Sequence, residues 1–112
     1  MRKNWVLLTA FIVLNIGFLS GCTQQSSPPV TTNTVTIKNF AFNPSTITIK
    51  AGANVTWTNE DSPSHQVKED NGLFLSSVIG NGQSFTYTFI TAGTYNYTCN
   101  IHPSMHGKVI VE

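Results

Sequence analysis

The sequence has few charged residues, and beyond its second residue it has no arginine. Charged side chains make up 10% of the 112 residues, and from Cys22 onward four lysines stand against five acidic residues, a net charge of −1 with histidine neutral. Nucleic-acid binding requires clustered cationic side chains, interleaved with aromatic residues where the strand is single. The sequence lacks such a cluster, so we expect no nucleic-acid partner.

Cysteine is also scarce, and its two positions do not predict a disulfide. Cys22 lies at the end of an apolar amino-terminal segment, where we expect it to serve in processing, and Cys99 is then left without a partner. An unpaired thiol in an exported protein requires its own explanation. A domain of this small size buries little more than ~60% of its unfolded surface, so metal binding by Cys99 would also help to stabilise it.

No stretch of the sequence has the periodicity of an amphipathic helix. From Thr34 onward, apolar residues instead recur at every second position, as in half-buried strands. These alternating residues are Val35, Ile37, Ile47, Ile49, Val55, Trp57, Phe85, Tyr87, Phe89, Tyr95, Tyr97, Cys99, Val109 and Val111. Turn residues such as Gly52 and Gly93 separate the runs. We therefore predict one all-β domain over residues 34–112, an antiparallel Greek-key β-sandwich.

The amino-terminal segment is predicted to be an export signal followed by a tether. Two cationic residues precede an apolar run, which is typical of a secretory signal over residues 1–21. The run ends in Leu19-Ser20-Gly21-Cys22, which resembles a bacterial lipobox, so Cys22 is the expected lipid attachment site. Residues 22–33 would tether the domain to the periplasmic or extracellular face of the membrane. The alternative is an uncleaved anchor, although the run is shorter than the ~20 residues that span a bilayer.

Three residues with different metal-binding atoms occur at every third position near the carboxyl end, namely Cys99, His102 and Met105. A short loop can close their thiolate, imidazole and thioether around one ion. His65 is the only histidine upstream, and we predict that it completes the set. Two histidines, a cysteine and a methionine are the ligands of blue-copper sites. Zinc is the alternative, but structural zinc sites use cysteine and histidine throughout.

Strand parity predicts that the Cys99 sulfur faces the interior, on the same side as Tyr95 and Tyr97. His65 follows a polar loop and is expected at the same end of the sandwich. His106 does not fit the ligand spacing. We expect it to be an exposed residue, with a replacement axial ligand or an adventitious metal ligand as the alternative.

The stretch from Gly93 to Cys99, followed by His102, Pro103, Met105 and residues 107–109, resembles the carboxyl end of amicyanin. The chain is thereby identified as similar to the cupredoxins, the type 1 blue copper proteins, among which it is nearest to the amicyanin and plastocyanin kind. The resemblance implies a cupredoxin-like sandwich with one copper ion. It also implies that the edge of the His102 ring reaches an apolar surface, near Ile101 and Pro103, where a redox partner protein docks.

Two departures from amicyanin lie beside the predicted ligands. Gln66 follows the first histidine where asparagine is usual, and Asn100-Ile101 stand in place of Thr-Pro. The usual asparagine ties the two ligand loops together, so we expect these positions to affect loop rigidity and reduction potential. Ile101, unlike proline, has a backbone N–H. We expect the amides of Gln66 and Ile101 to point at the Cys99 sulfur.

The sequence has no paired carboxylates and no nucleophile beside a base, and a closed copper site gives no reason to expect an enzyme. We therefore expect one-electron transfer by a monomeric, membrane-tethered carrier outside the cytoplasm. The alternative is an extracytoplasmic copper storage or delivery protein. Delivery proteins favour exposed, exchangeable and often methionine-rich ligands, whereas this sequence has two methionines, one of which is Met1.

Overall fold

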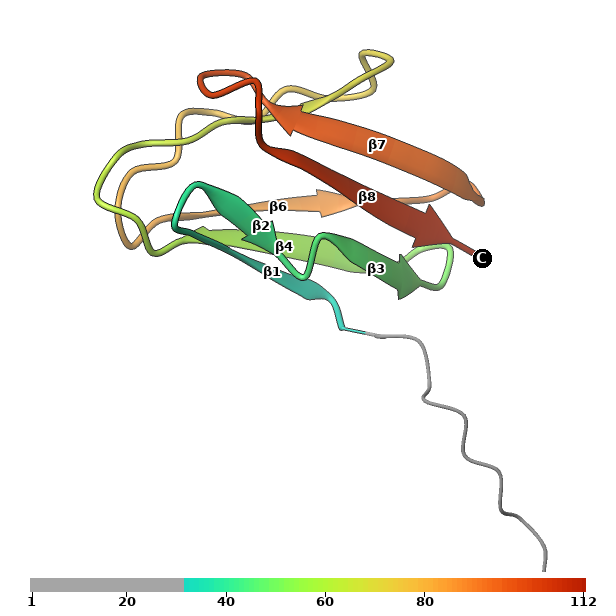
Figure 1. The fold of residues 1–112 in the computed structure, drawn as a ribbon. Coiled ribbons are helices and arrows are strands. Elements are labelled where there is room, and N and C mark those ends of the chain that lie inside the picture. Colours follow the sequence, from blue (N-terminus) through green and yellow to red (C-terminus); the bar gives the residue numbers. More distant parts are fainter. Residues whose placement is uncertain (1–31) are drawn as a thin grey trace, which may run out of the picture.

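The computed structural model describes residues 32–112, whose regular structure consists of eight β-strands in two packed sheets (Figure 1). The strands are β1 (Thr34–Lys38), β2 (Ala41–Asn43), β3 (Thr46–Ile49), β4 (Asn54–Asn59), β5 (Val67–Glu69), β6 (Ser84–Thr88), β7 (Gly93–Cys99) and β8 (His106–Val111). One sheet has the order β2-β1-β4-β6 and the other β3-β8-β7-β5. The predicted all-β sandwich is confirmed.

The export signal, the lipid attachment site and all but the last two residues of the predicted tether lie outside the described residues. Within residues 32–112, no helix is long and apolar enough to cross a membrane.

Each sheet contains one parallel pair, whereas the sequence predicted antiparallel strands. β1 runs parallel to β4, and β3 runs parallel to β8, while the remaining pairs are antiparallel. The chain changes sheets between β2 and β3, so later strands return beside earlier ones in the same direction. Alternation of apolar residues reports which face of a strand is buried, but it carries no information about the direction of the neighbouring strand.

The core between the sheets is formed mainly by the predicted alternating residues, together with Phe42, Val67, Ile79 and Met105, which that pattern did not include. Trp57 on β4 lies at its centre, fully buried and surrounded by other aromatic rings. Phe85 and Tyr87 are only half-buried, because β6 is an edge strand of its sheet. This close-packed aromatic core provides a rigid framework for the loops at the ends of the sandwich.

Strand register brings two distant segments together at one end of the sandwich. Val67 of β5 pairs with Cys99 of β7, so the chain just before β5 lies beside the loop between β7 and β8. β1 starts at the opposite end, because Thr34 pairs with Thr56 while Ile37 pairs with Asn59, the last residue of β4. The chain therefore enters the sandwich at the end remote from the β7–β8 loop (Figure 1).

Candidate metal centre

Cys99 is the last residue of β7, and its side chain is fully buried, as strand parity predicted. Its amide donates a hydrogen bond of 3.0 Å to the carbonyl of Met105, and the Met105 amide donates one of 3.0 Å to the carbonyl of His102. These two bonds close the β7–β8 loop into a tight turn. Cys99 and Met105 are buried in this turn, with Met105 2% exposed, and His102 is half-buried.

His65 approaches from a separate loop and is fully buried. Two backbone hydrogen bonds with Ile79, 3.0 and 2.7 Å long, fix its main chain. Its Nε2 atom lies 2.9 Å from Oδ2 of Asp61. Because a carboxylate accepts hydrogen bonds, we assign the ring proton to Nε2, which leaves the Nδ1 lone pair free for a metal. A carboxylate behind a metal-binding histidine commonly fixes the ring in this way.

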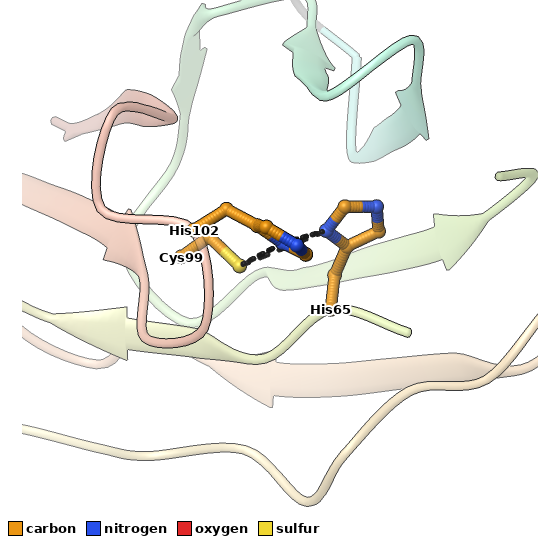
Figure 2. Close-up of side chains that lie close together, drawn as sticks. All are labelled: His65, Cys99 and His102. Carbon is orange, nitrogen blue, oxygen red and sulfur yellow. Dashed lines mark hydrogen bonds between the residues drawn. The ribbon is translucent and has the colours of Figure 1, made fainter. Parts of the chain in front are cut away.

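The donor atoms of three predicted ligands converge on one small volume (Figure 2). The Cys99 sulfur lies 3.7 Å from Nδ1 of His65 and 3.8 Å from Nδ1 of His102, and the two Nδ1 atoms are 3.2 Å apart. When one ion is bound through metal–nitrogen and metal–sulfur bonds of about 2.0–2.3 Å, the donor atoms around it lie ~3 to ~4 Å from one another. The donor set therefore fits a single transition-metal ion.

Asp61 joins the His65 loop to the turn between β1 and β2. Its Oδ1 and Oδ2 atoms accept hydrogen bonds from the amides of Asn39 and Phe40, at 2.7 and 2.9 Å. Burial alone would raise the pKa of Asp61, but the Phe40 and Asn39 amides and His65 outweigh burial and hold that pKa below its usual value. Asp61 thus stays ionised as an acceptor. Sequence reasoning missed it, because nothing local distinguishes it from the neighbouring Glu60.

Gln66 and Asn100 tie the two ligand loops together. The Asn100 amide donates to the Gln66 carbonyl at 2.8 Å, and the Asn100 side-chain amide donates to Oε1 of Gln66 at 3.0 Å. Nε2 of Gln66 in turn donates to the carbonyl of Ser76 at 2.8 Å. The longer side chain of Gln66 thereby spans the gap between the loops. That the amides of Gln66 and Ile101 point at the Cys99 sulfur stays a prediction.

Four other residues at or near this end, His106, Ile101, Pro103 and Phe40, are exposed. His106 is exposed and contacts Thr98, its Nδ1 lying 3.3 Å from the Thr98 hydroxyl, and it is not part of the converging cluster. Ile101 and Pro103, which flank His102 in the sequence, are exposed, and so is Phe40, which the sequence did not single out and whose ring contacts both histidines. The half-buried imidazole thus contacts one exposed aromatic ring and has exposed apolar residues as its neighbours in the sequence.

The chain is similar in sequence and in fold to proteins of one family. Residues 8–111 match the family model of a cupredoxin-like domain. Amicyanin-alpha of Methylorubrum extorquens is 36% identical over 93 residues, which cover 79% of this chain and 77% of that protein. The chloroplastic plastocyanin of Tetradesmus obliquus is 39% identical over 86 residues, 65% of this chain and 59% of that protein. A solved methionine-to-alanine mutant of amicyanin, in its Cu(I) form, has a TM-score of 0.68 and 32% identity, covering 70% of this chain and 80% of that one.

Proposed function

Because the chain belongs to the cupredoxin family, we propose that it is a one-electron carrier whose single type 1 copper ion is bound by His65, Cys99, His102 and Met105. The observation that carries the proposal is the convergence of two imidazole nitrogens and a thiol sulfur at one end of the sandwich. When bound there, copper supplies a Cu(I)/Cu(II) couple whose potential depends on the ligands and their burial.

The four residues have separate tasks in this proposal. Cys99 provides a buried thiolate at the end of a core strand, and His65 is aimed by the carboxylate behind it. His102 supplies the second imidazole, and Met105 offers a weak thioether from the same closed turn. Since a strand, a backbone bridge and a hydrogen-bonded turn hold these residues, little rearrangement is needed when the charge on the site changes, and this favours fast electron transfer.

We place the docking surface for a redox partner protein around His102. Of the two candidate imidazoles, that of His65 is fully buried, whereas that of His102 is half-buried. Exposed Phe40 and Ile101 lie close to His102. A small apolar surface suits the transient complexes of redox proteins, which are at the low end of interface size. The carrier role distinguishes the protein from an enzyme, which would need room for a substrate at the metal.

Voltammetry of the copper-loaded protein tests the carrier function. We expect one reversible, fast one-electron couple, with copper that stays bound when a competing chelator is added, because the ligands are held in place before the metal binds. A slow, irreversible response with ready transfer of copper to the chelator would instead favour the storage or delivery function. The two functions use the same residues, so the kinetics rather than the binding alone separate them.

We also propose that the carrier is exported and anchored through lipid at Cys22. The position of Thr34 at the end remote from the candidate centre supports this arrangement, because a tether joined there leaves His102 facing away from the membrane. In native cells, we expect a membrane-bound protein whose mature mass begins at an acylated Cys22, and Cys22→Ala should prevent this processing. A freely soluble, unmodified mature form would contradict the proposed anchor.

A further inference from the structure

The turn between β1 and β2 places a bulky residue in a backbone conformation that such residues rarely adopt. Asn39 and Phe40 have φ angles of 52° and 56°, both in the left-handed region. Asparagine tolerates this region, but for a phenylalanine it is an outlier with a free-energy cost. Such a conformation persists only where surrounding contacts impose it, and these contacts are often found at functional sites.

The Phe40 ring packs against both candidate histidine ligands. Its centroid lies 5.0 Å from that of His102 and 5.6 Å from that of His65, with interplanar angles of 87° and 86°. These are edge-to-face contacts, a favoured arrangement for aromatic rings. The ring is nevertheless 52% exposed, so Phe40 is not a core residue. Burial of apolar surface gives only a partial reason for its strained backbone.

A single oxygen atom of Asp61 fixes the Phe40 backbone relative to His65. Oδ2 accepts a hydrogen bond from the Phe40 amide at 2.9 Å and lies 2.9 Å from Nε2 of His65. Oδ1 accepts the Asn39 amide at 2.7 Å. Bonds to a charged acceptor are stronger than neutral ones, so this carboxylate can impose the left-handed turn. The position of the Phe40 ring is thereby set by the same group that aims the first histidine.

His102 is the ligand that most needs such support. The hydrogen bonds of its ring in the described part go to Cys99 and His65, which are themselves candidate ligands. No residue outside the candidate ligands is therefore hydrogen-bonded to the His102 ring in the described part. Phe40, which is not a candidate ligand, provides an aromatic contact that can hold this ring before metal binding. A half-buried imidazole without this contact would be free to rotate its Nδ1 away from the cluster.

We propose that Phe40 is a positioning residue, whose ring, held in place by Asp61, keeps the His102 imidazole aimed at Cys99 and His65 whether or not a metal is bound. The ring acts as a steric stop and does not bind the metal itself. Keeping a donor in its bound orientation lowers the cost of forming the site and slows the loss of the metal. The inference takes the identity of the ligands from the proposed function, but the order of His102 can be measured without copper.

The first test uses the metal-free protein and compares Phe40→Ala and Phe40→Gly with Phe40→Tyr, which keeps the ring. Imidazole ¹H–¹⁵N NMR spectra should show one sharp set of His102 signals in the wild type and in Phe40→Tyr. Both variants without the ring should give broadened or multiple His102 signals. Glycine also relieves the left-handed strain, so Phe40→Gly should resist urea better than Phe40→Ala while its His102 is equally mobile. A loss of stability alone would not produce this pattern.

The second test follows the rate at which the Cu(I) protein gives its metal to a chelator. We expect release to be about tenfold faster in Phe40→Ala than in the wild type and to stay within roughly twofold of wild type in Phe40→Tyr. Ile90→Ala is the matched control, since Ile90 is an exposed apolar residue outside the site. Ordered His102 signals and unchanged release in Phe40→Ala would overturn the inference. A wild type that does not bind copper would contradict the proposed function, while the metal-free spectra would still decide the role of Phe40.

Discussion

Replacing Cys99 by serine should abolish the intense blue colour of the copper(II) protein. The colour of a type 1 site arises from charge transfer between the thiolate and copper, so it requires the Cys99 sulfur, which lies 3.7 and 3.8 Å from the Nδ1 atoms of His65 and His102. Serine has a similar shape, but its hydroxyl stays protonated and is a poor ligand for copper. Visible absorption spectra of the oxidised wild type and variant, at equal copper content, measure the effect. We expect the strong band to be lost altogether in Cys99→Ser.

His106→Ala is the matched control for this experiment. His106 lies on the first residue of β8, close in sequence to the proposed ligands, but it is exposed and outside the converging cluster. The variant should therefore keep the blue band unchanged. A shifted or weakened blue band in His106→Ala would favour the alternative in which this residue is an axial ligand. A colourless wild type that takes up zinc in preference to copper would contradict the type 1 assignment itself.

Replacing Gly107 by alanine should destabilise the domain more than substitution at the other glycines of the described part. Gly107 on β8 pairs with Tyr97 on β7, and a Cβ atom at Gly107 would overlap the Tyr97 ring. That ring cannot move aside easily, because it is 1% exposed and packs edge-on against Trp57 and Phe42, with centroids 5.3 and 4.8 Å away. Overpacking of a rigid core costs 1–3 kcal/mol and occasionally more, so we expect a loss of roughly 3 kcal/mol in the free energy of unfolding. Urea denaturation of the metal-free protein measures it.

Two further variants separate this steric cause from a general intolerance of substitution. At Gly80 an added Cβ would meet mainly the end of the flexible Gln83 side chain, so Gly80→Ala should cost less than about 1 kcal/mol. Combining Gly107→Ala with Tyr97→Leu removes the ring that the new methyl group would strike. The double variant should then be more stable than the sum of the single effects predicts. Strict additivity would show that the clash with Tyr97 is not the cause.

The structure explains how the chain can depart from amicyanin beside the ligands without separating the two loops. Gln66 reaches both Asn100 and Ser76, so a longer amide side chain joins the segments that carry His65 and Cys99. From the sequence we expected the change from asparagine to Gln66 to affect loop rigidity. The sequence does not show which residues the Gln66 side chain contacts. The bonds made by Gln66 depend on residues 10 and 34 positions away in the chain.

Local patterns in the sequence were sufficient for the fold class and for the three candidate ligands near the carboxyl end. Alternation of apolar residues is a property of each strand alone, so it correctly indicated which side chains enter the core, among them Trp57 and Cys99. The spacing of Cys99, His102 and Met105 is likewise local, because one short turn contains all three. The resemblance to cupredoxins drawn from these residues is confirmed by the match over residues 8–111. Ligation of copper by His65, Cys99, His102 and Met105 and the lipid at Cys22 stay predictions.

Only the tertiary structure decided which strands run parallel and which residues surround the ligands. Asp61 binds the amides of Asn39 and Phe40, which lie 22 and 21 positions earlier in the chain, and these contacts exist only because β1 and β4 run side by side in the same direction. The edge-to-face packing of Phe40 on His102 depends in addition on how the two sheets pack, because His102 lies in the loop between β7 and β8 of the other sheet. Strand direction and register are set by the packing of the whole sandwich, whereas the pattern of a single strand fixes only which of its faces is buried. The sequence alone therefore indicated most of the strands and the ligand spacing, whereas the short strands β2 and β5 and the contacts that hold the ligands emerged only from the fold.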